Sequence, residues 1–240
     1  MAQKKVAPAI KQPQVLSIAL EVTGTASLIQ NCFDQKAIEQ MLRKHMGLSV
    51  EKEAKIPADC IKRAIIRNEK EAVCIPPTAF KKAMLTAAAR VKGLTKTALR
   101  AALFIEGGSI PITYSRMVPR MDMVILSGRS RVPDVRFRPE FEDWKAQMII
   151  LFSEQLPVQT VIDLLHRAGN VGVGEWRPER DGNFGTFEVT RSIADSKEIA
   201  NIRKNCRPPI KRLVIPEWAM NVEFSDEILK RLAAGASEPE

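Results

Sequence analysis

The stretch 143–153 constrains the fold most, because apolar and polar residues alternate along it and a helical pattern follows. The apolar residues recur at every second position: Trp144, Ala146, Met148, Ile150 and Phe152. A period of two predicts a strand with one buried face. Pro157 then opens a segment with apolar residues at helical spacing, which Gly169 ends. With a further strand predicted over 185–192, this stretch forms one half of an α+β domain.

A similar strand–helix–strand unit comes earlier in the chain. Residues 15–23 alternate as a half-buried strand, and 78–92 follows two prolines as an amphipathic helix that stops at Gly93. Residues 101–106 are apolar enough for a strand. The combined order, β-α-β-β-α-β, predicts a ferredoxin-like α+β fold, in which two helices cover one face of a four-stranded antiparallel sheet.

The remaining residues are predicted as additions to this domain. The first insertion follows the first strand and contains a helix at 35–44 and another short helix at 58–68. The second lies between the second and third strands. The predicted boundaries are a disordered basic arm over 1–14, the domain over 15–192, its insertions over 24–75 and 107–142, a C-terminal extension packed on the domain over 193–232, and a disordered tail over 233–240.

The charge balance favours a polyanionic partner. Lysine and arginine number 37 against 28 acidic residues, which gives a net charge of +9. Cations placed on phosphates release condensed counterions, so such an excess is typical of nucleic-acid-binding proteins. Simple solubility is the alternative, and the distribution of charge must decide between them.

One basic cluster lies on the helix predicted over 78–92 and just after it. Residues 80–100 contain six cations and no acid. A face of one sign lacks the mixed pairs that stabilise a solvated helix, which favours a bound polyanion over simple solvation. The candidate nucleic-acid-binding residues here are Lys81, Lys82, Arg90 and Lys92.

The second insertion is rich in arginine, whose planar guanidinium binds phosphate in two places and can stack on a base. Apolar residues between its first two arginines predict a tip that wedges between bases or contacts a neighbouring copy. Packing on the chain's own core is the alternative. The candidate binding residues are Arg116, Arg120, Arg129, Arg131, Arg136 and Arg138, and the wedge or oligomer contact is Met117, Val118 and Met121.

A glycine-rich segment follows the second predicted helix. Glycines allow backbone N–H groups to approach a phosphate and permit positive φ. A long hairpin loop is the alternative. The candidate binding residues here are Gly172, Gly174, Arg177, Arg180 and Gly185, with Gly182 as a further loop glycine.

Aromatic residues make up only 5% of the chain, so a double stacking platform is not expected and sequence preference should be weak.

This glycine-rich loop, placed between the second helix and the fourth strand, resembles the loop of the RAMP superfamily of CRISPR-associated proteins. The chain is most similar to their backbone subunits, with residues 24–75 as the helical insertion and 107–142 as the thumb. The segments LIQNCFDQKAIEQML and VGVGEWRPERDGNFGTFEV also resemble small phage-encoded proteins. The resemblance implies a protein that binds a guide RNA and forms a homo-oligomer along it. The loop departs from the family in carrying Glu175, Glu179 and Asp181.

Catalysis is not expected. The sequence has two histidines and no HExxH, GxSxG or P-loop motif. Weak catalytic candidates are Asp34, which the family resemblance places where target-cleaving relatives carry an aspartate, and His45. Neither a cofactor nor a metal is predicted.

The functional prediction is a non-catalytic protein that binds single-stranded RNA or DNA, with RNA favoured. The alternatives are a single-strand DNA annealing protein, a mimic of a nucleic-acid-binding partner, and a RAMP-type ribonuclease.

The predicted location is the cytoplasm. No apolar run reaches the ~18 residues that a membrane span needs, and the first residues lack a signal-peptide stretch. The four cysteines lie far apart without a CxxC pair, which predicts four buried thiols in a reducing compartment rather than disulfides or a metal site: Cys32, Cys60, Cys74 and Cys206.

Overall fold

The computed structural model describes residues 13–33, 35–50, 54–125 and 132–220. Several sequence-based predictions lie outside these residues: most of the basic arm, the tail over 233–240, the end of the C-terminal extension, Asp34, Arg129 and Arg131.

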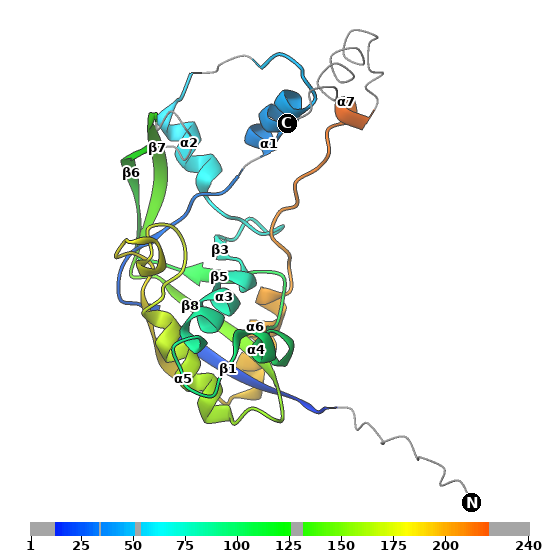
Figure 1. Ribbon diagram of the computed structural model, residues 1–240, viewed down its shortest axis with the longest axis vertical. Coiled ribbons are helices and arrows are strands. Elements are labelled where there is room, and N and C mark those ends of the chain that lie inside the picture. The colour runs from blue at the N-terminus through cyan, green and yellow to red at the C-terminus, as the bar shows by residue number, and fades with distance from the viewer. Residues whose placement is uncertain (1–12, 34, 51–53, 126–131, 221–240) are drawn as a thin grey trace, which may run out of the picture.

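A six-stranded antiparallel sheet forms the body of the molecule (Figure 1). Its central strand β1 (Val15–Gly24) pairs with β8 (Lys145–Ser153) on one side and β9 (Phe187–Ile193) on the other. Beyond β8 lie two short strands that share its outer edge, β4 (Leu103–Ile105) and β5 (Ile110–Thr113), and then β3 (Cys74–Ile75). This order, with the fourth strand beside the first and the third on its other side, confirms the ferredoxin-like α+β fold.

Two helices, α3 (Pro77–Ala88) and α5 (Val158–Gly169), lie together against one face of the sheet. The alternation of β8 places its even-numbered apolar residues on the buried face, as predicted. Phe80 of α3 packs edge to face against Phe187 of β9, with 5.5 Å between the ring centroids. The Trp144 ring packs against the same phenylalanine with a centroid distance of 6.1 Å. These aromatic contacts join α3 to the sheet and to the start of β8.

Two predicted elements differ from the structure. The helix expected over 78–92 ends at Ala88, because the chain turns so that Leu94 packs against the core. The strand expected over 101–106 begins as a helix, α4 (Lys96–Ala102), and only then becomes β4. The side chain of Thr95 accepts a hydrogen bond from the Ala98 amide at 3.2 Å and so caps this helix.

The opposite face of the sheet carries α6 (Ser196–Cys206), which Asp195 caps through the amides of Lys197 and Glu198. The Gln147 side chain of β8 contacts Glu198 of this helix at 3.0 Å. The chain then runs through residues 211–216 to α7 (Glu217–Met220) near α1, as Figure 1 shows.

The insertion between β1 and α3 stands above the sheet. It contains β2 (Leu28–Ile29), α1 (Gln35–His45) and α2 (Pro57–Ala64) before β3. The helix predicted over 35–44 is confirmed, whereas the one predicted over 58–68 ends at Ala64.

The insertion between β5 and β8 is a long two-stranded ribbon, formed by β6 (Arg116–Ile125) and β7 (Pro133–Glu142). β2 pairs with the base of β7, so the two insertions share a second, three-stranded sheet. Figure 1 shows this ribbon rising beside α2, while the loop that follows α5 lies against its base.

The cysteines are free thiols. Burial raises the pKa of Cys74 to about 12 and that of Cys206 to about 11. Cys32 and Cys60 are partly exposed, so the prediction that all four are buried is wrong for these two. Within the described residues, no helix is long and apolar enough to cross a membrane, and no group of acidic, histidine or cysteine side chains could hold a metal.

Candidate nucleic-acid interface

The ribbon β6–β7 has one apolar face and one charged face. The register places Met121 opposite Phe137 and Met123 opposite Val135 on the apolar face. On the charged face, Arg120 lies opposite Arg138 and Asp122 opposite Arg136. Residues directly opposite in an antiparallel pair project to the same side, so one face is apolar throughout and the other is mostly charged, with Val118 and Val124 among its residues.

The charged face meets the glycine loop, which we define as residues 171–186. The Arg120 guanidinium lies 4.7 Å from the centre of the Phe184 ring. Next to this contact is a hollow of about 390 Å³, which we call the Arg138 hollow; it is lined by Val124, Arg138, Glu175, Trp176, Arg177 and Arg180. Candidate residues from the ribbon and from the loop, which are far apart in sequence, therefore come together at one place.

Arg138 is the buried cation of this hollow. Its side chain is 2% exposed, and Oδ2 of Asp122 is 3.5 Å from Nη1. The Glu175 carboxylate, which lines the same hollow, is a further favourable charge. Its Nε has no hydrogen-bond partner. Burial lowers the pKa of Arg138, and the nearby carboxylates of Glu175 and Asp122 oppose that shift. Arginine side chains stay protonated in proteins, so Arg138 carries a charge. The structure thus holds a charged donor that is out of water and incompletely paired.

Arg120 is fully paired in contrast. Its Nε donates to Oδ1 of Asp122 at 2.7 Å, and its Nη1 donates to Glu140 at 3.1 Å. Asp122 is therefore shared between two arginines and lies closer to Arg120 than to Arg138. An anion entering the hollow would find Arg138 available and Arg120 already neutralised.

Trp176 supplies an aromatic ring at the same hollow. Its side chain is 37% exposed and its φ is +51°, a conformation that non-glycine residues rarely adopt. Arg180 follows at the surface, and among the described residues its side chain has no ion pair or hydrogen bond. A ring and an unpaired guanidinium next to a buried cation are the groups that bind one nucleotide.

The glycines let the loop pack closely against the protein's own backbone. Gly174 and Gly185 have φ of +79° and +67°. A Cβ on Gly185 would lie 1.8 Å from the Val173 carbonyl oxygen, and one on Gly174 would lie 2.5 Å from that of Ile29. Gly172, with φ of +77°, lies close to the Arg177 side chain. These glycines are therefore required by close contacts within the protein itself. This agrees with the alternative given from the sequence, in which the segment is a long hairpin loop and its glycines do not contact a phosphate.

Arg177 holds the loop together. Its Nη1 donates to the Gly174 carbonyl at 2.7 Å, and its Nε and Nη2 both donate to Glu179 at 3.0 and 2.8 Å. Glu179 also accepts from the Thr86 hydroxyl of α3 at 3.1 Å. The loop is thereby tied to the helix beneath it.

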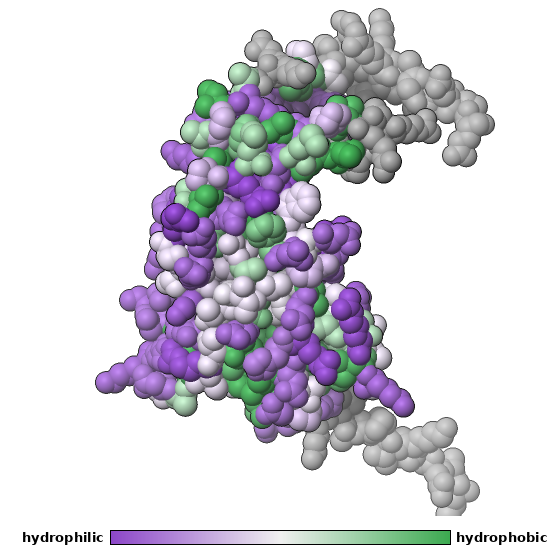
Figure 2. Space-filling model, turned by 90° about the vertical axis from the view of Figure 1, so that its left-hand side faces the viewer, coloured by the Kyte–Doolittle hydropathy of each residue, from purple (hydrophilic) through white to green (hydrophobic). Residues whose placement is uncertain are grey.

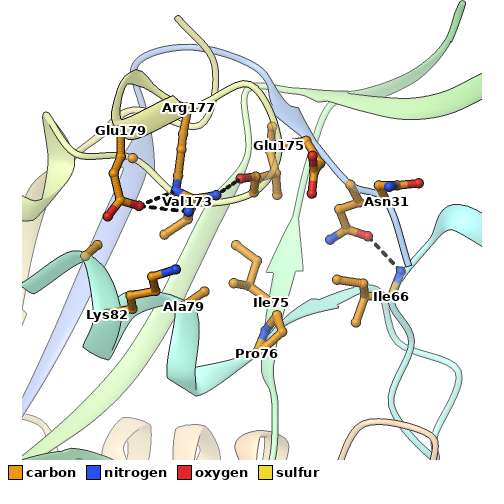
Figure 3. A pocket seen from close by; sticks show the side chains of 15 residues that line it. Asn31, Ile66, Ile75, Pro76, Ala79, Lys82, Val173, Glu175, Arg177 and Glu179 are labelled. Atoms are coloured by element: carbon orange, nitrogen blue, oxygen red, sulfur yellow. Dashed lines mark hydrogen bonds and ion pairs between the residues drawn. The ribbon is translucent and has the colours of Figure 1, made fainter. Parts of the chain in front are cut away.

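A second pocket, of about 240 Å³, lies between the glycine loop and the first turns of α3 (Figure 3). We call it the Lys82 pocket. It shares Glu175 and Arg177 with the Arg138 hollow, so the two cavities are neighbours across the loop. Figure 3 shows Lys82 reaching from α3 toward the loop.

The other predicted cations on and after α3 do not join this site. Lys81 donates to the Arg100 carbonyl at 3.0 Å and lies over the Phe104 ring. Arg90 and Lys92 are exposed beyond the end of α3. The predicted common face is therefore split, because Lys81 and Lys82 point to different neighbours and the helix ends before Lys92.

Three further predicted residues lie elsewhere. Arg116, at the base of the ribbon, is paired with Glu142 at 3.0 Å. Arg136 lies opposite Asp122 on the charged face and lines a larger cavity beside α2. His45 is the exposed last residue of α1, where a basic side chain suits the helix dipole.

The apolar residues predicted as a tip lie along the side of β6, since the turn of the ribbon falls outside the described residues. Met117 and Met121 are on the apolar face, whereas Val118 is on the charged face. Met123 and Ile125 extend the apolar face and are 75% and 65% exposed. Figure 2, which views the ribbon side of the molecule, shows apolar atoms in green over its upper part.

Trp176 and Phe184 were not singled out from the sequence. A double stacking platform consists of aromatic residues on strands, and neither of these residues lies on a strand. The sequence did contain one signal for them, because each aromatic residue stands between glycines. A ring in a short glycine-rich loop cannot easily reach the hydrophobic core and is therefore left near the surface.

Comparison with known proteins gives distant structural likenesses and no match to the sequence. No protein-family model and no curated protein matches the sequence. Among solved structures, the chain is similar to one from a cryo-electron microscopy study of the type III-B Cmr-beta complex bound to cognate target RNA, with 11% identity and a TM-score of 0.45. The match covers 75% of this chain and 60% of that chain, so this protein spans less than two thirds of the length of its match.

Proposed function

We propose that this protein is a non-catalytic, single-stranded nucleic-acid-binding protein whose strand lies along the charged face of the ribbon and the glycine loop. The observation that carries the proposal is the Arg138 hollow. It combines a buried, incompletely paired guanidinium with the exposed ring of Trp176 and the unpaired side chain of Arg180.

A phosphate satisfies what Arg138 lacks. Leaving a buried charged donor without a partner costs about 1–3 kcal/mol or more, and a phosphate oxygen accepts from a guanidinium in a strong, charge-assisted hydrogen bond. Arg180, which is exposed beside it, adds a second cation without the cost of burial. The stacking of one base on Trp176 then favours a single strand, because the bases of a duplex already stack on one another.

RNA is the strand we favour, on the resemblance of the sequence to RAMP backbone subunits. Several copies assemble along the strand through the exposed apolar face of the ribbon, which Met121, Met123 and Ile125 form with their neighbours. Because the hollow holds about one nucleotide, strong binding to a long strand requires adjacent copies.

Fluorescence anisotropy with labelled single-stranded RNA, single-stranded DNA and duplexes of equal length tests the proposal. We expect single strands to bind more tightly than duplexes, with RNA ahead of DNA, and no shortening of the RNA on a denaturing gel. Preference for DNA together with strand annealing would indicate a recombination-type protein. Absence of binding to every probe would indicate a mimic of a nucleic-acid-binding partner, and RNA cleavage would overturn the non-catalytic part of the proposal.

A further inference from the structure

The Lys82 pocket lies where the next part of a bound nucleotide would reach. It shares Glu175 and Arg177 with the Arg138 hollow, so a phosphate at Arg138 and a base in the Lys82 pocket would be separated only by the glycine loop. Its volume of about 240 Å³ is large enough for a nucleobase.

The walls of the Lys82 pocket are mostly apolar. They include Ile66 and Ile75, the ring of Pro76, Ala79 and Val173 (Figure 3). Apolar walls with a few polar groups are the usual construction of a site for a flat ring, since the walls desolvate the ring and the polar groups orient it.

Two polar side chains of the pocket are already used by the protein. Gln30 donates to the Cys74 carbonyl at 3.0 Å and accepts from the Ile66 amide at 2.8 Å. Arg177 is occupied by Glu179 and the Gly174 carbonyl. These groups shape the pocket and have little capacity left for a ligand.

Three other side chains remain available. Within the described residues, the side chains of Asn31, Lys82 and Glu175 form no side-chain hydrogen bond or close ion pair, and only longer-range attractions link Glu175 to Arg138 and Lys82 to Glu179. Together they offer an ammonium that only donates, a carboxylate that only accepts when ionised, and an amide that does both. A matching base must present donors and acceptors side by side.

We infer that the Lys82 pocket binds a guanine base of the bound strand. Guanine presents N1–H and N2–H₂ as adjacent donors, which suit the Glu175 carboxylate. Its O6 and N7 are acceptors, which suit Lys82 and the Asn31 amide. Adenine and cytosine carry both donor hydrogens on one exocyclic amine, and uracil has a single N–H, so none of them presents donors on two adjacent atoms. The inference rests on the proposed function and adds to it a preference for one base, in place of the weak sequence preference expected from the sequence.

Competition binding tests this inference with polyuridine strands that carry a single guanosine, adenosine, cytidine or inosine. We expect the guanosine strand to bind about tenfold more tightly than the adenosine and cytidine strands, the discrimination that one good bidentate contact supplies. Inosine lacks the N2 amine but keeps N1–H, so it should lose only the part of the preference that comes from the N2 contact to Glu175.

Two variants assign the preference to the pocket. Glu175→Gln should bind guanosine and inosine strands equally, and Lys82→Met should reduce the preference for guanosine over adenosine. Lys92→Met is the matched control, because Lys92 is exposed beyond α3 and does not line the pocket. Equal binding of all four strands, or preference for another base, would overturn the guanine assignment while leaving the proposed function intact. No binding by any strand would overturn both.

Discussion

Arg120 lies directly opposite Arg138 across the β6–β7 ribbon, and both guanidinium groups share the carboxylate of Asp122. Arg120 takes the shorter contact and has Glu140 as a second partner. Arg138, which is more deeply buried, keeps a 3.5 Å contact and an unpartnered Nε. The pair therefore divides into a structural arginine and one whose charge is available to a ligand.

Substitution of Trp176 should weaken binding without unfolding the protein. Trp176→Ala is expected to cost about 1–3 kcal/mol of binding free energy, the usual contribution of one base stacked on an aromatic ring. Trp176→Phe should restore most of it. Tryptophan fluorescence in a Trp218→Phe background offers a direct measurement, because Trp144 is buried and Trp176 is then the one exposed tryptophan.

The control for this prediction is the fluorescence of the phenylalanine variant. Quenching by a single strand should be present in the Trp218→Phe background and largely lost when Trp176→Phe is added, although that variant still binds. Full quenching in Trp176→Phe would show that the strand lies elsewhere.

Substitution of Gly185 should destabilise the fold rather than affect binding alone. A Cβ at Gly185 would meet the Val173 carbonyl at 1.8 Å, so Gly185→Ala should cost about 3 kcal/mol or more of unfolding free energy. Gly93 is a matched control with a φ of +88° and no atom within 4 Å of the added Cβ. Gly93→Ala should cost only about 1–2 kcal/mol, from its left-handed backbone. Equal losses in urea denaturation would contradict the packing described for the loop.

Binding should weaken steeply with salt. If about five cations contact phosphates, the slope of log affinity against log salt concentration should be near −3.5, at about 0.7 per contact for a single strand. Arg138 and Arg180 are the contributors that we expect from the Arg138 hollow, and exposed cations outside it would supply the rest. A slope shallower than about −1, measured by anisotropy over a salt series, would remove phosphate contact as the source of affinity.

The apolar face of the ribbon should control assembly. Met121→Ser combined with Met123→Ser removes two side chains that are 68% and 75% exposed, so the monomer should remain folded. Light scattering on long single strands should show multimers of the wild type and single copies of the variant. Val118→Ser, on the charged face, is the matched control. One wild-type copy per strand at every length would exclude the filament.

The sequence predicts the sheet well where both periodicity and end signals are present. The strand over 143–153 and the helix that Gly169 ends have both, and they appear as β8 and α5. The strand expected over 101–106 has neither, and Thr95 instead caps a helix there. A short apolar run does not distinguish the two structures, because tertiary packing decides between them.

The candidate site could be predicted only as a set of residues. Arginine content identified Arg116, Arg120 and Arg138 together, but their availability depends on which residue lies opposite each across the ribbon. The register places Glu142 opposite Arg116 and leaves Arg138 beside an arginine. This information comes from the pairing of two strands, which no local pattern in the sequence contains.

The substitution Arg138→Met tests the central claim most directly, because a ligand-binding role and a structural role predict opposite results. Methionine fills similar space without charge, and Asp122 retains Arg120 as a partner. We predict that the unfolding free energy stays the same or rises, while affinity for a single strand falls about ten- to a hundredfold, which corresponds to the loss of about 1.5–3 kcal/mol for a charged hydrogen bond. Arg116→Met, at an exposed ion pair on the same ribbon, should change either quantity little. An Arg138→Met variant that binds as tightly as the wild type, or that loses the about 3–5 kcal/mol of stability typical of a broken buried ion pair, would contradict the account.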